Sequence, residues 1–330
     1  MRVLVADTFP ETRLAELAAD GHAYRYRPEA TTGELPAEVA GMQALVVRST
    51  RVPAEVVTAG GDLRLVIRAG AGTDTIDTAA AARAGVRVCN VPGRNSAAVA
   101  ELACALLLAL DRDIVGNVTA LRTGTWDKAG FSRARGIADR DVGIVGLGRI
   151  GLEFAARVAA FGARVHTVAK PGRSAEVAER AEQLGVRYVD DLPALARTCD
   201  VLSLHAPGDS GTLLDRHVLA ELRPGAIVLN TARAHLVDEA ALIEVMDARG
   251  ILAGIDVFAA EPAGGTGTIS SNLAAHPNVY GTHHIGASTR QAQDAVAAEV
   301  VRMLRAFGQG EVRHCVNGEQ LPAEVTGGAA

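Results

Sequence analysis

The sequence predicts an α/β protein built from two parallel-sheet domains. Short continuous apolar runs alternate with Ala-rich helical stretches along almost the whole chain, as in parallel strands covered by helices on both faces. The 330 residues suit two domains of ordinary size. With 48% hydrophobic and 22% charged residues, the chain carries enough apolar surface for two cores. We therefore expect two doubly wound sheets.

Four apolar runs predict the strands of an N-terminal sheet. They are 2–6, 44–49, 63–69 and 86–91. The segment PETRLAELAAD after the first run has helical spacing, and Ala-rich helical stretches separate the later runs. This part of the chain, about 1–92, contains no glycine fingerprint.

A long helical segment begins near Asn95, runs through ELACALLLALDRDI and leads into a second series of strands. Strands alternating with helices in this way predict a doubly wound, six-stranded nucleotide-binding sheet. The expected strand segments are 141–146, 163–169, 186–190, 200–206, 225–232, 252–258 and 278–283.

The C-terminal part is expected to return to the first domain. An amphipathic helix over 288–307 leads to VRHCVN, a short strand that needs a sheet edge. We expect GGTG (264–267) to be a loop and the tail AEVTGGAA to be disordered. The predicted domains are 1–93 with 287–330 for one, and 94–286 for the other.

Charge and targeting patterns exclude several classes of protein. The net charge of −5 argues against a broad basic surface for nucleic acid or an anionic membrane. The N-terminus is apolar for only four residues before Asp7, and the longest apolar run, 102–110, is far too short for a membrane span. We expect a cytoplasmic protein that binds small molecules.

The cysteine and histidine spacing points to no metal. The four cysteines lie far apart with no CxxC, and no His/Cys spacing suggests zinc. We expect them to pack in the core of a protein in a reducing compartment. They are Cys89, Cys104, Cys199 and Cys315.

The motif GLGRIG (146–151) predicts a dinucleotide site. It follows the apolar strand DVGIV and opens the helical stretch EFAARVAAF. Gly146 permits a tight turn, Gly148 lets the backbone approach a pyrophosphate, and Gly151 lets the helix pack on the strand. The diphosphate would bind the N–H groups at the positive end of that helix. Because strand, glycines and helix occur in order, we predict a Rossmann fold.

The end of the second strand bears on the choice of cofactor. An acidic residue is expected there to bind the ribose hydroxyls, but this strand ends at Ala169 and is followed by Lys170 and Arg173. No carboxylate would repel a 2′-phosphate, and two cations are near, which favours NADP(H) over NAD(H). The alternative is that both cations are solvated and NAD(H) binds without the acid.

Three later segments place polar residues just past strand ends, where open α/β sheets bind ligands. They are 231–242, 254–262 and 282–289. With these segments the chain resembles the D-isomer-specific 2-hydroxyacid dehydrogenases over roughly 2–318. VVRST, RAGAGTDTID, NVPGRNSAAVAE and HHIGAST are most similar to the branch that acts on 3-phosphoglycerate. The resemblance implies a flavodoxin-like substrate domain beside the Rossmann domain.

The resemblance implies a catalytic set of Arg233, Glu261 and His284, and the chemistry of these residue types fits a 2-oxoacid. Arg233 can clamp the carboxylate bidentately and polarise the ketone. His284 can donate a proton to the developing alkoxide in reduction and remove it in oxidation. Glu261 would fix the tautomer of His284 and favour its protonated form.

Further contacts are implied by the resemblance. Together with the glycine turn and the end of the second strand, which the residues themselves indicate, they give a cofactor site of Gly146, Gly148, Arg149, Ile150, Gly151, Ala169, Lys170, Arg173, His205, Ala206, Pro207, Thr231, Ala232, Asp256 and Gly286. The substrate would be bound by Arg48, Ser49, Ala71, Gly72 and Lys128, together with Arg233 and His284. Lys128 matches a basic position that the family can present from a partner subunit.

The chain departs from the family pattern at three positions. His283 stands where a proline is usual, Ala234 replaces a glycine, and Ala169 replaces an aspartate. Because the chain ends near residue 330, we expect no C-terminal regulatory domain and no serine feedback through one. We expect a homodimer, since the helix with Leu102, Leu106, Leu107 and Leu110 is apolar over much of its surface, and the family resemblance implies the same.

The substrate is expected to be a three-carbon acid with an anion at C3. Arg48 and Lys128 would suit such an anion, so 3-phosphoglycerate/3-phosphohydroxypyruvate comes first. A phosphonopyruvate-type analogue comes second, and glyoxylate or hydroxypyruvate third. A non-catalytic, dinucleotide-sensing corepressor-like protein is the alternative of a different class.

Overall fold

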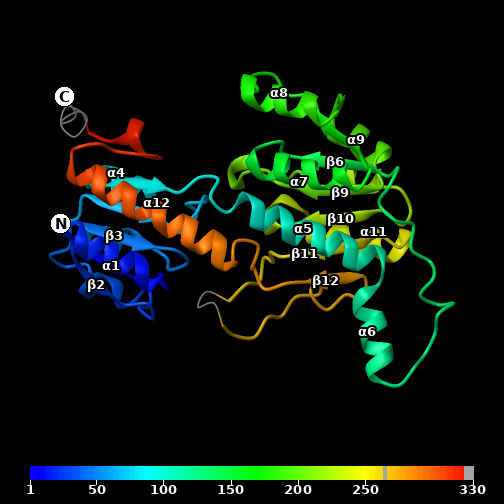
Figure 1. The fold of residues 1–330 in the computed structure, drawn as a ribbon, viewed down its shortest axis with the longest axis horizontal. Coiled ribbons are helices and arrows are strands. Elements are labelled where there is room, and N and C mark those ends of the chain that lie inside the picture. Colours follow the sequence, from blue (N-terminus) through cyan, green and yellow to red (C-terminus); the bar gives the residue numbers. More distant parts are fainter. Residues whose placement is uncertain (263–265, 323–330) are drawn as a thin grey trace. The chain divides into compact units, whose positions relative to one another are not determined.

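The computed structural model describes residues 1–262 and 266–322, which form two compact units (Figure 1). The first unit comprises Met1–Asn95, residues 266–267 and the described chain from Ser288, and the second comprises Ser96–Pro262 and Thr268–Ala287. The expected loop at 264–267 lies partly, and the tail at 323–330 wholly, outside the described residues. The division into two domains, 1–93 with 287–330 and 94–286, stays a prediction.

The first unit contains a five-stranded parallel sheet of order β2-β1-β3-β4-β5. Four strands confirm the predicted apolar runs: β1 (Arg2–Val5), β3 (Ala44–Val47), β4 (Leu65–Arg68) and β5 (Arg87–Asn90). The remaining strand, β2 (Ala23–Tyr26), was not predicted. It is an edge strand whose residues are mostly exposed, so it lacks the apolar run that marks a buried strand.

Alternation along β1 explains the two cores of this unit. Val3 and Val5 face a core shared with α1 (Glu11–Ala19) and α12 (Arg290–Gly308), whereas Leu4 faces the opposite core. That second core is covered by α2 (Leu35–Glu38), α3 (Ala54–Ala59) and α4 (Thr78–Arg83). The segment VRHCVN reaches the edge of the sheet at β5 as expected, but it forms a single antiparallel bridge, between Cys315 and Cys89, and not the expected strand.

The second unit contains a seven-stranded parallel sheet of order β12-β11-β10-β9-β6-β7-β8. Every predicted segment forms a strand, so the sheet has one strand more than the six expected. The additional edge strand is the short β12, which pairs in parallel with β11. The strands are β6 (Asp141–Val145), β7 (Arg164–Val168), β8 (Arg187–Val189), β9 (Val201–Leu204), β10 (Ile227–Asn230), β11 (Leu252–Ile255) and β12 (Val279–Gly281).

Helices cover both faces of this sheet. On one face α5 (Ser96–Asp111) packs against α7 (Arg149–Ala160), with Phe154 fully buried between them and the strands. The other face carries α9 (Leu192–Thr198), α10 (Arg216–Ala220) and α11 (Glu239–Arg249), while α8 (Ala175–Gln183) packs on α7. Within the described chain, no helix is long and apolar enough to cross a membrane.

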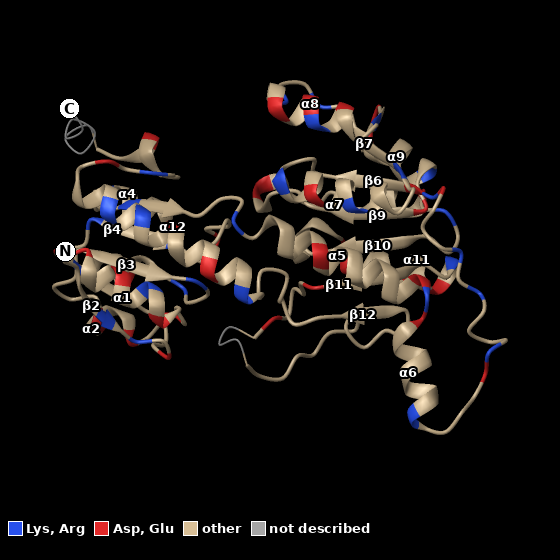
Figure 2. Ribbon diagram, viewed as in Figure 1, with Lys and Arg blue, Asp and Glu red and all other residues tan. Residues whose placement is uncertain are grey.

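The expected long helix is interrupted after Asp111. Asp113 adopts a left-handed backbone (φ 44°), and a second helix, α6 (Ile114–Arg122), starts in a new direction and extends away from the sheet of its unit (Figure 1). Basic and acidic residues are interspersed along the ribbon of both units (Figure 2).

Candidate active site

The loops after three adjacent strands carry the predicted catalytic residues. The last residues of β10 and β11 pair as Asn230 and Ile255, and Ile255 pairs with Gly281 of β12. The carboxyl ends of these parallel strands therefore lie side by side at the same end of the sheet, where ligands bind in open α/β folds. Arg233, Glu261 and His284 follow β10, β11 and β12, respectively.

His284 and Glu261 form a direct pair. Nδ1 of His284 lies 2.8 Å from Oε2 of Glu261, and Oε1 of Glu261 accepts a 2.8 Å hydrogen bond from the N–H of Phe258. Because a carboxylate only accepts, the shared proton belongs to Nδ1, and Nε2 is left to exchange a proton with a ligand. This is the arrangement expected of an acid–base histidine held by a carboxylate.

The backbone around His284 is held by Asp256, which is 1% exposed. His284 has a left-handed φ of 52°, which is uncommon for a residue other than glycine. The carbonyl of Asp256 accepts from the N–H of His284 at 2.8 Å. The Asp256 carboxylate accepts from Thr282 Oγ1 and from the N–H groups of Ile285 and Gly286, at 2.6, 2.8 and 2.9 Å. Asp256 therefore positions the histidine loop, a role that the sequence did not predict; its expected cofactor contact stays a prediction.

Arg233 is presented by a turn that Asn230 organises. Asn230 is 2% exposed; its Nδ2 donates to the carbonyl of Arg233 at 2.8 Å and its Oδ1 accepts from the N–H of Ala232 at 3.1 Å. Nη1 of Arg233 donates to the carbonyl of Ala232 at 2.7 Å. Asn230 was not among the predicted site residues, although a polar residue at the end of an apolar run was a usable signal.

The glycine turn fits a bound diphosphate. Gly146 has a φ of +99°, and a Cβ there would lie 2.6 Å from the nitrogen of Ala206. A Cβ on Gly151 would lie 2.2 Å from the carbonyl oxygen of Gly146, so helix and strand approach closely. In contrast, apart from Gly148 and its two chain neighbours, no described residue has an atom within 4 Å of a Cβ on Gly148. No side chain caps the start of α7 among the described residues, which leaves the N–H groups of Arg149 and Ile150 for an anion.

Two buried polar atoms near the neighbouring strand ends are also suited to a ligand. His205, after β9, binds Ser203 Oγ through Nε2 at 2.9 Å, and burial lowers its pKa to about 3, so the ring is neutral. Its Nδ1 and Oγ1 of Thr231 are buried without a partner in the described chain. Such orphaned atoms are rare in folded proteins unless a ligand satisfies them. The predicted residues Ala206, Pro207, Ala232 and Gly286 lie in the same loops.

The end of β7 presents the residues expected to select the cofactor. Ala169 and Lys170 are exposed, and the guanidinium of Arg173 donates to the carbonyl of Val168 and lies over the ring of Tyr188, 5.7 Å from its centroid. Nε of Arg173 is buried without a partner among the described residues. The Arg173 guanidinium is thus fixed at the strand end, whereas Lys170 reaches into solvent.

The expected substrate residues of the first unit cluster at the carboxyl end of its own sheet. The N–H groups of Arg48, Ser49 and Thr50 all donate to Oδ2 of Asp7, at 2.6, 3.1 and 3.1 Å. The side chain of Arg48 donates to Oγ of Ser288 at 3.0 Å.

Neighbouring residues complete that edge. The turn with Ala71 and Gly72 is held by Asn90, whose Nδ2 donates to the carbonyl of Ala71 at 2.6 Å. Arg68 ends β4 and pairs with Val47, the residue before Arg48; it was not among the predicted site residues. Lys128 belongs to the second unit, where it is exposed after α6.

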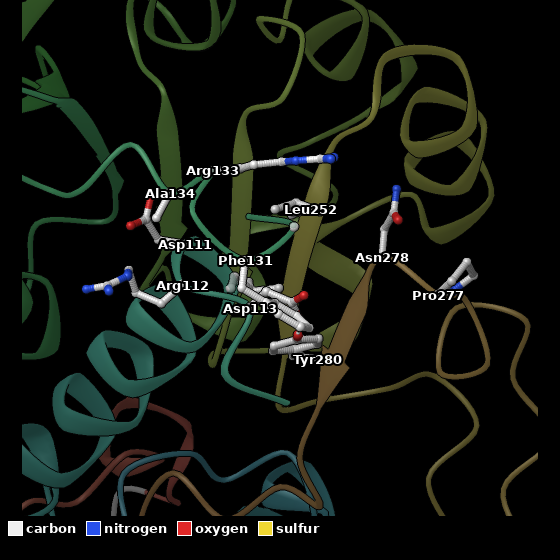
Figure 3. A pocket seen from close by; sticks show the side chains of 12 residues that line it. Asp111, Arg112, Asp113, Phe131, Arg133, Ala134, Leu252, Pro277, Asn278 and Tyr280 are labelled. Carbon is white, nitrogen blue, oxygen red and sulfur yellow. The ribbon is translucent and has the colours of Figure 1, made fainter. Parts of the chain in front are cut away.

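A separate cavity of about 410 Å³ lies away from these residues (Figure 3). It opens beside Leu252, the first residue of β11, and so at the opposite edge of the sheet from the strand ends described above. Asp113 and Tyr280 meet there through a 2.5 Å hydrogen bond. None of the predicted site residues lines this cavity.

Comparisons with known proteins agree with this geometry. The profile of the family described as "D-isomer specific 2-hydroxyacid dehydrogenase, NAD binding domain" matches residues 104–286. The D-3-phosphoglycerate dehydrogenase of Mycobacterium leprae (strain TN) is 41% identical over 313 residues, which are 94% of this chain and 57% of that protein. The chain therefore spans little more than half the length of that relative.

Two further relatives are similar over most of both chains. The hydroxypyruvate reductase of Thermotoga maritima is 38% identical over 82% of this chain and 86% of its own. The solved structure of an NADPH-dependent glyoxylate/hydroxypyruvate reductase from Sinorhizobium meliloti is 29% identical and superposes with a TM-score of 0.82 over 96% and 97% of the two chains. With the profile match over more than half of its length and these identities, the chain belongs to the D-isomer-specific 2-hydroxyacid dehydrogenase family.

Proposed function

We propose that the protein interconverts a 2-oxoacid and a D-2-hydroxyacid with a nicotinamide dinucleotide. The observation that carries this proposal is the 2.8 Å His284–Glu261 pair. Glu261 follows β11, which pairs with β10, the strand that precedes Arg233, and His284 follows β12 on the other side of β11. The glycine turn at the start of α7 lies at the same edge of the sheet. Family membership supports the same reaction class.

The residues divide the chemistry among them. The bound nicotinamide supplies or accepts the hydride at C2 of the substrate. Arg233 binds the substrate carboxylate with its planar fork and polarises the ketone. Nε2 of His284 gives a proton to the alkoxide oxygen in reduction and takes it back in oxidation. Glu261, bonded to Nδ1, keeps the ring oriented with Nε2 available to the substrate.

For the substrate we propose a three-carbon acid with an anion at C3, with 3-phosphoglycerate/3-phosphohydroxypyruvate as the first choice. Support comes from Arg48 at the end of β3 and Arg68 at the end of the adjacent β4, and from the name of the Mycobacterium leprae relative. The name of the Thermotoga maritima relative, hydroxypyruvate reductase, supports hydroxypyruvate as the competing choice of substrate. A phosphonopyruvate-type acid would use the same cations.

A panel of 2-oxoacids tests the proposal. Oxidation of NADH and NADPH is followed with 3-phosphohydroxypyruvate, phosphonopyruvate, hydroxypyruvate and glyoxylate at matched concentration. We expect the highest kcat/KM with 3-phosphohydroxypyruvate. A higher value for hydroxypyruvate or glyoxylate would refute the C3 anion. Cofactor binding without turnover of any of the four would favour the non-catalytic, dinucleotide-sensing alternative.

We further propose that NADPH is preferred to NADH. A charge-assisted contact from Lys170 or Arg173 to the 2′-phosphate is worth roughly 1.5–3 kcal/mol, and partial exposure reduces it. We therefore expect about a tenfold preference in kcat/KM, at ~1.4 kcal/mol per decade, and a smaller one at high salt. The double variant Ala169→Asp, Lys170→Ala should reverse it, since the new carboxylate binds the ribose diol and repels a phosphate.

Steady-state kinetics with both cofactors at two salt concentrations measures this preference. Lys128→Ala, which removes the other lysine of the chain, is the matched control and should leave the NADPH/NADH ratio unchanged. Equal use of both cofactors would mean that Lys170 and Arg173 leave the 2′-phosphate unbound. A clear preference for NADH would refute the proposal.

We also propose a homodimer, on grounds that differ from the sequence argument. Leu106, Leu107 and Leu110 of α5 are buried inside their own unit, so they are not free for a partner. The exposed apolar surface lies instead on α6, which has no buried residue, and on the following turn. It consists of Ile114, Val115, Val118, Leu121 and Trp126. Exposed apolar residues that recur along one short helix and the turn after it favour association with another chain.

Sedimentation at micromolar concentration tests the dimer. We expect the mass of two chains for the wild type and a shift toward monomer for the double variant Leu121→Glu, Trp126→Ser. Tyr188→Ser, which changes an exposed aromatic residue elsewhere, is the matched control and should remain dimeric. A wild-type protein that sediments as a monomer would contradict the proposal and the expected cross-subunit role of Lys128.

A further inference from the structure

Two cysteines from distant parts of the chain meet at the open edge of the first unit's sheet. Cys89 of β5 and Cys315 form an antiparallel bridge. The N–H of Asn90 donates to the carbonyl of His314 at 3.2 Å, and the N–H of Val316 donates to the carbonyl of Val88 at 2.8 Å. These bonds flank the two cysteines, which therefore form a non-hydrogen-bonded pair.

The backbone of such a pair suits a disulfide. Directly opposite residues of a non-hydrogen-bonded antiparallel pair have Cα atoms about 4.5 Å apart. Disulfides span Cα separations of about 4.4–6.8 Å. Both side chains lie on the same face of the sheet. Cys89 belongs to the hydrophobic core on that face, and the partly buried Cys315 packs against the same core. An S–S bond can form here without moving the strand.

The two sulfurs differ in solvent exposure and in pKa, and both differences favour disulfide formation. Cys89 is 1% exposed, whereas Cys315 is partly accessible. The interaction between the two neighbouring thiols raises the pKa of Cys89 and lowers that of Cys315, and Sγ of Cys315 also donates to Oδ1 of Asn317 at 3.4 Å. Cys315 is thus the accessible, more acidic thiol, and Cys89 is the thiol placed to attack it once it is oxidised.

The remaining cysteines provide an internal contrast. Cys104 and Cys199 are buried, and burial raises their pKa to about 11 and about 12. They lie in two different cores of the second unit, so neither has the other as a neighbour. Thiols of this kind are expected to be inert.

We propose that Cys89 and Cys315 form a reversible disulfide that joins the two chain segments of the first unit. With a peroxide as oxidant, the Cys315 thiolate attacks one oxygen, the O–O bond breaks, and Cys315 becomes a sulfenic acid. The Cys89 sulfur then attacks the Cys315 sulfur, forms the S–S bond and releases the oxygen as water. Two thiols and one peroxide thus yield one disulfide and two waters. A dithiol reductant restores both thiols by exchange.

The position of the bond gives it a structural effect. The first unit is discontinuous: Cys89 belongs to Met1–Asn95, and Cys315 to the segment that begins at Ser288. The disulfide would close a loop that contains the whole second unit. Cross-linking across a long loop stabilises a fold mainly by restricting its unfolded chain. Oxidation would therefore stabilise the first unit without requiring a change in its strands.

Peptide mapping of the full chain tests whether the bond forms. Reduced protein is exposed to hydrogen peroxide, free thiols are alkylated under denaturing conditions, and a non-reducing digest is analysed by mass spectrometry. We expect one linked peptide pair containing Cys89 and Cys315, lighter than the separate peptides by two hydrogen atoms and lost after treatment with dithiothreitol. Cys104 and Cys199 should be alkylated throughout. Full alkylation of Cys89, or Cys315 oxidised beyond the sulfenic acid with Cys89 still a thiol, would overturn the proposal.

Thermal unfolding tests the structural effect of the bond. We expect the linked wild type to melt about 5 °C or more above the reduced protein. Cys315→Ser, treated in the same way, should show no such shift, whereas Cys104→Ser should behave like the wild type. Equal melting temperatures for the linked and reduced wild type would show that the bond does not stabilise the unit.

Discussion

Replacing His284 by alanine is expected to lower turnover by about 10²–10⁴-fold, the usual contribution of a positioned general acid–base group. The ring that is removed is the one whose Nδ1 binds Glu261 at 2.8 Å and whose Nε2 is left for the substrate. Without it, the alkoxide must take its proton from water. Binding of the dinucleotide should persist, because the glycine turn at 146–151 does not involve this loop.

Single-turnover kinetics with a saturating 2-oxoacid, together with cofactor titration by nicotinamide fluorescence, measures both expectations. His283→Ala is the matched control: it removes the adjacent, exposed imidazole and should retain most of the activity. Near-normal turnover of His284→Ala combined with a large loss in His283→Ala would transfer the acid–base role to His283. Near-normal turnover of both variants would remove histidine from the proton transfer.

The parts of the fold that the sequence predicted well are those where burial dictates residue type. Strands such as β10, whose four residues are all buried, leave continuous apolar runs that are visible without a structure. The edge strand β2 was missed because exposed edges accept Tyr and Arg. The break between α5 and α6 was missed because it depends on the left-handed backbone of Asp113, which apolar periodicity does not reveal.

The candidate site shows the same division. Motifs predicted the loops that carry Arg233 and His284, since each follows a strand with a recognisable apolar run. The residues that hold these loops were missed or given another role, because Asn230 and Asp256 act through hydrogen bonds to backbone groups. Such hydrogen bonds depend on which backbone groups the folded chain brings near these side chains. For the same reason, the sequence placed Cys89 and Cys315 in the core without pairing them.

Replacing Arg233 by lysine is expected to lower kcat/KM by about a hundredfold or more, although the positive charge is kept. The guanidinium can bind both carboxylate oxygens in one plane while Nη1 remains bonded to the carbonyl of Ala232 at 2.7 Å. An ammonium group cannot do both, so at least one charge-assisted bond to the substrate is lost. Each such bond is worth roughly 1.5–3 kcal/mol, and the weaker polarisation of the ketone adds a loss in kcat.

Initial rates over a range of substrate concentration separate these two effects. We expect KM to rise because the carboxylate is held less firmly, and kcat to fall because the ketone is less polarised. Arg216→Lys is the matched control, since Arg216 forms an exposed ion pair with Glu244 and should tolerate the change. A variant with the kcat/KM of the wild type would show that Arg233 serves only to shape its turn. A rise in KM alone would confine Arg233 to binding the carboxylate and leave polarisation of the ketone to His284.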